Sequence, residues 1–248
     1  LSSAGKVYRI DRDKMEMNVL FASPKEADSN VIFSNLFFDG KGILWLASYD
    51  DGIFRVTFPG EQFYLTTPRI GFNSKVSSEK EYTSIKALFK SNNGDIWVGS
   101  RSSELFHFNQ DKNLKNIFSP GNHYIGNVYH IMEDREGTLW FSTKGQGLVR
   151  AVRDQTSSAG YRFNKYMHDP YNSNSISSND VYYTYQDSKG RIWVATFGGG
   201  LNLLQEERGH VLFKHKYNSF SNYPEYGQYM EVRAIVEDEK GRIWVGTS

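Results

Sequence analysis

Apolar residues along this chain occur in short runs interrupted by polar positions, and the runs recur in sets of four. A first run, such as 128–132 or 232–236, leads into an acidic turn and a second run. A third run with alternating positions follows, as at 52–56 and 147–151, and then a more variable fourth, as at 161–166. Short alternating runs indicate half-buried β-strands, and no segment has the 3.6-residue period of a helix. The pattern therefore predicts an all-β chain.

The second run of every set contains a tryptophan, and these are the only five tryptophans in the sequence. They are Trp45, Trp97, Trp140, Trp193 and Trp244, each preceded three positions earlier by a glycine. Successive tryptophans are 43 to 53 residues apart, so the chain is built from a repeat of about 50 residues. Four strands per repeat of this length are typical of a β-propeller blade. We expect the tryptophans to be structural, packing between neighbouring sheets.

A short acidic turn joins the first and second runs of each repeat. Its first residue is Asp39, Asp134, Asp187 or Asp238, with Ser91 in the second repeat, and a glycine follows three positions later. Asp, Asn or Ser at the first position and Gly at the fourth are typical of a type I turn, in which the glycine is free to take a positive φ. Each turn is therefore expected to close a hairpin onto the tryptophan strand.

These repeats predict a β-propeller of about five four-stranded blades. The end of one blade occupies residues 1–27, successive blades occupy 28–78, 79–123, 124–175 and 176–226, and a further blade starts at 227–248. Residues 5–11 resemble the third strand of a blade, so the two ends could close a five-blade ring. In such a ring Val7 would follow Trp244 by eleven positions, whereas Ile53 follows Trp45 by eight. An arc cut from a larger propeller is the preferred interpretation.

Composition and motifs exclude several function classes. Lys and Arg number 29 against 28 Asp and Glu, so the chain lacks the basic surface typical of nucleic-acid binding. The absence of cysteine excludes disulfides, thiolate metal sites and cysteine nucleophiles. The six histidines fall at no metal-ligand spacing, and no nucleophile elbow, P-loop or zinc-protease motif occurs. We therefore expect no metal, no cofactor and no catalytic residue in this chain.

Three stretches resemble the two-component regulator propeller repeat. Residues 232–247 read Val-x-x-Ile-x-Glu-Asp-x-x-Gly-Arg-Ile-Trp-Val-Gly-Thr, and the blocks 168–181 and 186–202 resemble the same family. The second repeat matches less well, because Ser91 replaces Asp there. The resemblance implies the periplasmic sensor region of a bacterial hybrid two-component receptor. In this family the propellers precede a membrane helix and a histidine kinase, and many members respond to oligosaccharides.

The resemblance therefore implies a ligand-sensing module that is not itself an enzyme, with the kinase outside this chain. The implied partners are an oligosaccharide, the remaining propeller blades and the downstream signalling domains of the parent chain, and a homodimer is left open. A propeller glycosidase or lyase is the enzymatic alternative, and it would need acidic residues that converge on the channel outside the turns. A protein-interaction scaffold without a small ligand is the other alternative.

One face of the propeller is predicted to bind the ligand. Because strands alternate in direction, the loops after the tryptophan strands share a face with the starts of the first strands, opposite the acidic turns. The turns share one plain pattern from repeat to repeat, whereas this other face varies between repeats, as a binding site grafted onto a repeat would. Its candidate residues are Tyr49, Asp50, Lys86, Arg101, Tyr129, Lys144, Tyr182, Phe197 and Arg233. Simple drift of loop sequences is the alternative explanation.

A second aromatic cluster lies in the loop 218–229, which contains Tyr223, Tyr226 and Tyr229. Tyrosine suits sugar faces because it combines an apolar ring with a polar tip. Packing between blades is the competing explanation for any single tyrosine, and it applies least to a loop cluster, since binding residues concentrate on loops.

Overall fold

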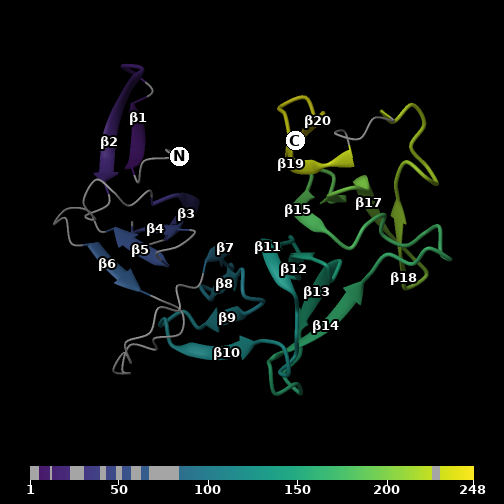
Figure 1. Cartoon of the computed structure of the whole chain (residues 1–248), viewed down its shortest axis with the longest axis horizontal. Coiled ribbons are helices and arrows are strands. Elements are labelled where there is room, and N and C mark those ends of the chain that lie inside the picture. The colour runs from purple at the N-terminus through teal and green to yellow at the C-terminus, as the bar shows by residue number, and fades with distance from the viewer. Residues whose placement is uncertain are drawn as a thin grey trace.

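The computed structural model describes residues 6–11, 13–22, 31–39, 43–48, 52–56, 63–66, 84–224 and 230–248. These residues form β-strands and connecting turns, and they contain no helix long and apolar enough to cross a membrane. The strands form four antiparallel sheets of four strands each, with a two-stranded hairpin at either end (Figure 1). The all-β propeller fold predicted from the sequence is confirmed.

The sheets follow one another along the chain. The first hairpin comprises β1 (Lys6–Asp11) and β2 (Glu16–Ala22). Blade 1 comprises β3 (Phe33–Phe38), β4 (Leu44–Ser48), β5 (Ile53–Val56) and β6 (Phe63–Thr66). Blade 2 comprises β7 (Ile85–Lys90), β8 (Ile96–Ser100), β9 (Leu105–Phe108) and β10 (Leu114–Phe118). Blade 3 comprises β11 (Asn127–Glu133), β12 (Leu139–Lys144), β13 (Leu148–Arg153) and β14 (Tyr161–Tyr166). Blade 4 comprises β15 (Val181–Gln186), β16 (Ile192–Thr196), β17 (Gly200–Glu207) and β18 (His210–Lys214), and the last hairpin comprises β19 (Val232–Glu237) and β20 (Ile243–Thr247).

The sheets stand side by side in an arc, with the first strand of each blade on its inner side (Figure 1). Along this inner side β3 contacts β7, β7 contacts β11, β11 contacts β15, and β15 contacts β19. The hairpins β1–β2 and β19–β20 lie at opposite ends of the arc, apart from each other. The sheets do not close into a ring, in agreement with the predicted arc.

Hydrophobic cores lie between neighbouring blades. Trp97 of blade 2 packs against Val128 and Phe141 of blade 3, and Trp140 of blade 3 packs in the core that includes Val181 of blade 4. Both tryptophans are almost completely buried, at 0% and 1% exposure. The tryptophan of the last hairpin, Trp244, is 55% exposed, because none of the described sheets packs on its outer side. Contact with a following sheet therefore decides how deeply each tryptophan is buried.

Hydrogen bonds tie the acidic turn of a repeat to its tryptophan. In blade 3, Thr138 N donates to Asp134 Oδ1 at 2.8 Å and Trp140 Nε1 donates to Asp134 Oδ2 at 2.8 Å. Gly137 closes this turn with a φ of +79°, as expected for the fourth turn position. The same bond joins Trp45 to Asp39, Trp193 to Asp187 and Trp244 to Asp238. One carboxylate thus fixes both the turn and the indole ring.

Blade 2 replaces this bond by a ring stack. Ser91 stands at the turn position, and the buried Trp97 Nε1 has no hydrogen-bond partner in the part of the chain that the structure describes. The indole stacks instead on His107, with ring centroids 4.0 Å apart and an interplanar angle of 4°. His107 Nε2 pairs with Asp95 Oδ2 at 2.9 Å. Burial lowers the pKa of His107 despite this carboxylate.

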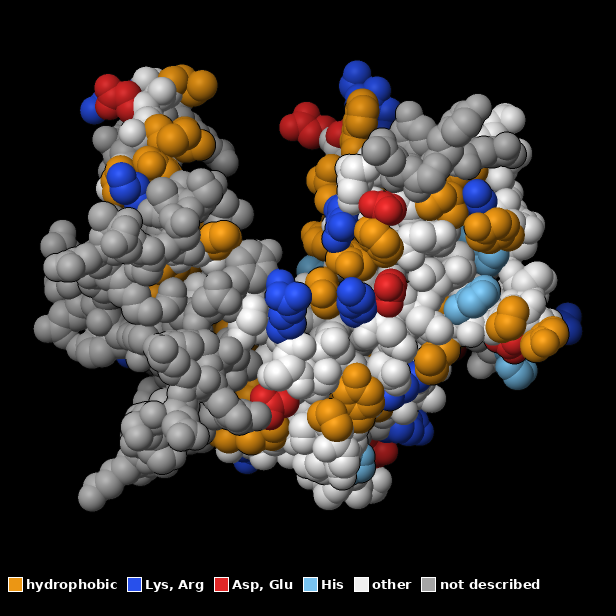
Figure 2. Space-filling view, in the orientation of Figure 1, with side chains coloured by type: hydrophobic (Ala, Val, Ile, Leu, Met, Phe, Trp, Pro, Cys, Tyr) orange, Lys and Arg blue, Asp and Glu red, His pale blue; other side chains and the backbone are white. Residues whose placement is uncertain are grey.

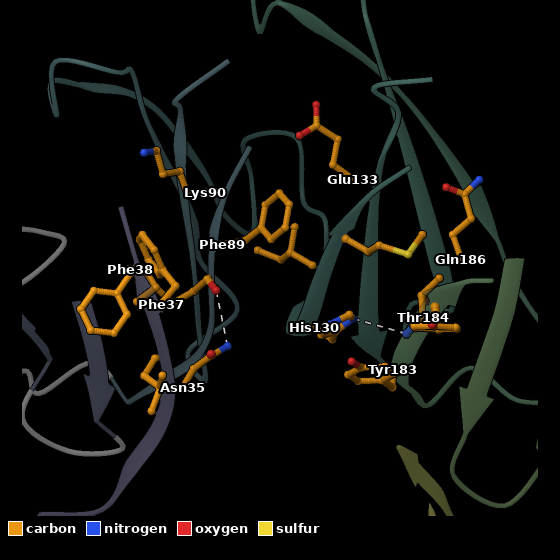
Figure 3. A pocket seen from close by; sticks show the side chains of 15 residues that line it. Asn35, Phe37, Phe38, Phe89, Lys90, His130, Glu133, Tyr183, Thr184 and Gln186 are labelled. Atoms are coloured by element: carbon orange, nitrogen blue, oxygen red, sulfur yellow. Dashed lines mark hydrogen bonds between the residues drawn. The ribbon is translucent and has the colours of Figure 1, made fainter. Parts of the chain in front are cut away.

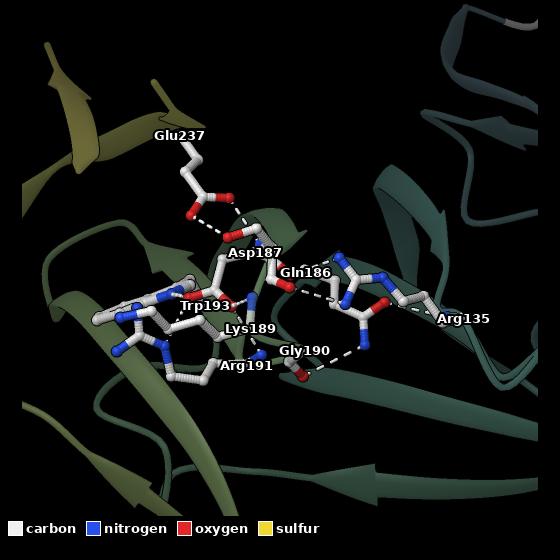
Figure 4. Close-up of polar contacts among 9 residues, drawn as sticks. Arg135, Gln186, Asp187, Lys189, Gly190, Arg191, Trp193 and Glu237 are labelled. Atoms are coloured by element: carbon white, nitrogen blue, oxygen red, sulfur yellow. Dashed lines mark hydrogen bonds and ion pairs between the residues drawn. The ribbon is translucent and has the colours of Figure 1, made fainter. Parts of the chain in front are cut away.

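Further bonds link neighbouring blades on the side of the acidic turns, which we call the turn face. The last residue of a first strand accepts a hydrogen bond from a backbone nitrogen in the preceding turn (Figure 4). The pairs are Glu133 with Asn92, Gln186 with Arg135, and Glu237 with Ser188, at 2.6 to 2.9 Å. The Arg135 guanidinium also donates to the carbonyl oxygens of Asp187 and Ser188. The turn face is therefore occupied by contacts that hold the fold together.

Candidate functional site

The first strand of each blade, and β19 of the last hairpin, has a β-bulge near its start. In β11, Val128 pairs with Thr143 and His130 pairs with Ser142, which leaves Tyr129 without a cross-strand partner. The same register shift occurs in β3, β7, β15 and β19. The bulged residues are Ser34, Lys86, Tyr129, Tyr182 and Arg233. Because a bulge re-aims a side chain, each strand presents one residue at the same level, on the face opposite the turn face.

Four of the bulged residues form a continuous row across neighbouring blades. The rings of Tyr129 and Tyr182 lie 4.9 Å apart between centroids. Lys86 Nζ lies 5.9 Å from the Tyr129 ring centroid, and the guanidinium carbon of Arg233 lies 4.4 Å from that of Tyr182. Figure 2 shows Lys and Arg side chains among hydrophobic ones along the inner edge of the arc, over the region of β7, β11, β15 and β19. Basic side chains thus flank an aromatic pair at this edge.

Phe197 adds a third ring from the loop after β16. Its centroid lies 5.6 Å from that of Tyr182, and the Arg233 guanidinium carbon lies 5.0 Å from it. Backbone contacts hold the loop, since Phe197 N donates to Asp180 O at 2.8 Å and Phe197 forms a β-bridge with Glu231. We call Lys86, Tyr129, Tyr182, Phe197 and Arg233 the rim row. All five are candidate residues named from the sequence, and their role in binding stays a prediction.

The other predicted residues are not joined to the rim row. Arg101 and Lys144 lie at the ends of the tryptophan strands of blades 2 and 3 and are exposed. No hydrogen bond, ion pair or ring contact connects either side chain to the rim row among the described residues. Tyr49 and Asp50 lie outside the described residues.

Sequence reasoning missed Ser34, the bulged residue of blade 1. Its hydroxyl donates to Ile85 O of the next blade at 3.1 Å, so it bonds to the neighbouring backbone. Alignment of the first strands could have found the position, because a buried apolar residue precedes every bulge. These preceding residues are Phe33, Ile85, Val128, Val181 and Val232.

The loop tyrosine Tyr223 supports the fold at β17. Leu201 N donates to its hydroxyl at 2.9 Å. A Cβ atom at Gly200 would lie 2.7 Å from the same hydroxyl oxygen, which explains a glycine there together with its φ of +76°. These contacts match the packing explanation for Tyr223. Tyr226 and Tyr229 lie outside the described residues.

A cavity of about 540 Å³ lies on the inner side of the arc, lined by β3, β7, β11 and β15. Figure 3 shows Phe38 and Phe89 on one side of it and His130 with Tyr183 on the other. The His130 and Tyr183 rings are stacked with centroids 3.9 Å apart. Thr184 N donates to His130 Nδ1 at 3.3 Å, so the neutral imidazole carries its proton on Nε2. Burial lowers the pKa of His130 to about 4, so the ring is neutral at pH 7.

Acidic and histidine side chains do not gather into a metal site in the described ranges: no three of them are grouped so that they could hold an ion. Lys90, Glu133 and Gln186 lie at the turn-face end of the cavity, and Asn35 lines it from β3.

Three of the repeats match a known family of propeller repeats. Residues 125–145, 175–198 and 227–248 match the family described as two component regulator propeller. These three segments, which make up less than half of the chain, are similar to the repeats of that family. The resemblance drawn from the sequence is thereby confirmed. Each matched segment of this propeller also contains a bulged residue, namely Tyr129, Tyr182 or Arg233.

Similar proteins include a histidine kinase, a lyase and an extracellular two-component domain. Histidine kinase P4 of Formosa agariphila is 35% identical over 102 residues, and the propeller covers 7% of that protein. Virginiamycin B lyase from Staphylococcus aureus is 14% identical with a TM-score of 0.65, over 98% of this chain and 70% of the lyase. An extracellular domain assigned to hybrid two component system BT4673 of B. thetaiotaomicron is 14% identical with a TM-score of 0.59, over 98% of this chain and 36% of that domain. At these identities the structural likeness shows the propeller fold alone.

Proposed function

We propose that this chain belongs to the ligand-sensing propeller of a bacterial two-component receptor, lies in the periplasm and binds an oligosaccharide at the rim row. The family repeats and the histidine kinase relative support the sensor role. The fold shared with an extracellular two-component domain supports the location. The partners in this proposal are the oligosaccharide, the other blades and signalling domains of the parent chain, and a second copy of the receptor.

The rim row is the observation that carries the proposal. One backbone bulge is used five times, yet it presents Ser, Lys, Tyr, Tyr and Arg. A position that only stabilised the fold would keep one residue type, as the tryptophans do. Tyr129 and Tyr182 offer apolar ring faces and hydroxyls, which suit a sugar ring. Lys86 and Arg233 flank them with hydrogen-bond donors for hydroxyl or acidic groups.

We propose a binding role without catalysis for this segment. General base catalysis needs an acceptor nitrogen or oxygen close to the substrate proton. In His130, the described histidine of the cavity, Nδ1 already accepts the Thr184 N–H and Nε2 carries the proton. The imidazole therefore suits hydrogen-bond donation to a ligand. The likeness to virginiamycin B lyase concerns the fold and brings no catalytic residue with it.

Glycan binding by matched tyrosine variants tests the proposal. The labelled chain is screened on an array of acidic and neutral oligosaccharides, and the strongest binder is titrated by calorimetry. Replacing both Tyr129 and Tyr182 by Ala removes two stacking surfaces, so affinity should fall at least about tenfold while the melting temperature stays near that of the wild type. Tyr171→Ala is the control, since this side chain is 97% exposed and outside the rim row.

Three outcomes contradict the proposal. Absence of binding to every glycan would exclude the oligosaccharide. Full affinity in the double variant would place the site elsewhere. Turnover of a bound glycan, followed by product analysis, would favour the glycosidase or lyase alternative over a binding role.

A further inference from the structure

Arg233 is held in one orientation by contacts from three segments. It occupies the bulge of β19, and its guanidinium carbon lies 4.4 Å from the Tyr182 ring centroid and 5.0 Å from that of Phe197. Its Nε donates to Ser248 Oγ at 2.8 Å. The stacking and this bond fix the plane of the guanidinium before any ligand arrives, while the side chain remains exposed.

The guanidinium of Arg233 differs from the other arginines that stack on aromatic rings in the described residues. Arg150, Arg191 and Arg242 lie over Trp140, Trp193 and Trp244, respectively. Each of these three is also ion-paired, with Glu206 at 3.4 Å, Asp187 at 2.6 Å and Asp238 at 2.6 Å, respectively. Among the described residues, no carboxylate oxygen lies within 4.0 Å of the Arg233 guanidinium. Arg233 is thus held by stacking and one hydrogen bond to a hydroxyl, and its charge is not paired with a described carboxylate.

An oriented guanidinium without a carboxylate is suited to an anionic group of a ligand. Its two Nη atoms form a planar fork that matches a carboxylate or sulfate, and such charge-assisted bonds are shorter and stronger than those to neutral hydroxyls. The adjoining Tyr182 and Tyr129 rings run from Arg233 toward Lys86, so a sugar attached to the anionic group would lie along them. Positive charge at both ends of the aromatic pair favours an acidic ligand over a neutral one.

We infer that Arg233 binds the carboxylate or sulfate group of an acidic oligosaccharide, whose sugar rings stack on Tyr182 and Tyr129. This inference rests on the proposed function, because it names the class of glycan that the rim row takes. Arg233 is then the residue that selects the ligand class, and the two tyrosines supply affinity that is shared by acidic and neutral sugars.

A two-stage binding experiment tests the inference. The labelled chain is screened against tetragalacturonate, heparin and chondroitin sulfate tetrasaccharides, cellotetraose and mannotetraose, and the strongest binder is titrated with wild type, Arg233→Gln, Arg233→Lys and Arg242→Gln. Arg242→Gln is the matched control, since this arginine also stacks on an aromatic ring but lies beside an acidic turn. Thermal melts confirm that each variant folds.

The expected result is stronger retention of acidic than of neutral glycans, with affinity for the best acidic one reduced at least about tenfold in Arg233→Gln. Arg233→Lys should recover part of that loss, because it keeps the charge without the planar fork. Arg242→Gln should bind as the wild type does. Preference for a neutral tetrasaccharide, or unchanged affinity in Arg233→Gln, overturns the inference and leaves the proposed function standing. Binding to no glycan on the array overturns both.

Discussion

The two faces of this propeller differ in what is repeated from blade to blade. On the turn face, the backbone turn and its side chains are repeated together: four of the five tryptophans bond to the Asp six positions earlier, at 2.8 to 3.2 Å. On the opposite face the bulge is repeated and the side chain is not. Five bulges carry four residue types, and the resulting contacts reach from blade to blade without filling the core. A repeat fold can therefore keep its stability on one face and vary its surface chemistry on the other.

Blade 2 shows that even the turn face tolerates one exception. There the Asp–Trp bond is missing, and the stacked His107 with its partner Asp95 fills the space around Trp97.

Removal of a buried tryptophan that bonds to an acidic turn should have the largest effect on stability. Trp140→Ala deletes a side chain that is 1% exposed, so we expect the free energy of unfolding to fall by about 3–5 kcal/mol in chemical denaturation. Trp244→Ala is the matched control, because the same residue of the same motif is 55% exposed and should cost much less. Equal losses in the two variants would show that packing between blades does not explain the repeated tryptophan.

Acidification should destabilise the inner strands through His130. Its pKa falls from 6.5 to about 4 on folding, so the unfolded chain takes up a proton first as the pH drops. Stability is therefore complete above pH 6.5 and declines between pH 6.5 and 4, by about 2–3 kcal/mol for this group. Burial shifts His107 and His215 in the same direction.

His130→Gln isolates the contribution of this histidine, because the Gln carbonyl can still accept the Thr184 N–H. Urea unfolding at pH 7 and pH 4.5 should show a smaller loss of stability in the variant than in the wild type. An identical loss in both proteins would assign the acid sensitivity to other groups.

Exchange of the turn residue between blades tests the Asp–Trp bond itself. Asp134→Ser removes the acceptor of the buried Trp140 N–H and should cost about 1–3 kcal/mol. Ser91→Asp offers the unpaired Trp97 N–H an acceptor and should stabilise the protein by about 1 kcal/mol. Thermal melts of both variants check the pair. Destabilisation by Ser91→Asp would mean that the nearby Asp95–His107 pair excludes a second carboxylate.

Much of the fold could be predicted from the sequence because its signals are local. Glycine three positions before each tryptophan marks the turn and the second strand, and alternation marks the third. The bond from Trp140 to Asp134 and the stack of Trp97 on His107 were not predicted. They depend on where side chains point across a hairpin, which the spacing does not reveal.

The site was predicted in part for a similar reason. The alternating direction of successive strands is enough to place Lys86, Tyr129, Tyr182 and Arg233 at one face of the propeller, with Phe197 in a loop at the same face. The bulged position has no residue type in common, being Ser, Lys, Tyr or Arg, and only the buried apolar residue before it recurs in every first strand. Arg101 follows β8 as Phe197 follows β16, and its backbone nitrogen donates to Ser84 O just as that of Phe197 donates to Asp180 O. The side chains of these two loop residues nevertheless differ in their contacts, and the direction of a loop side chain cannot be read from spacing.

The central claim is that ligand binds the rim row and not the turn face, and hydroxyl-radical footprinting with mass spectrometry tests it most directly. The chain is oxidised with and without the strongest glycan from the array, and modification is compared residue by residue. We predict protection of Tyr129, Tyr182 and Phe197, with Trp244 and the exposed Tyr171 unchanged. Protection at Trp244, or at Phe38 and Phe89 in the cavity, without protection of the rim row would contradict the claim.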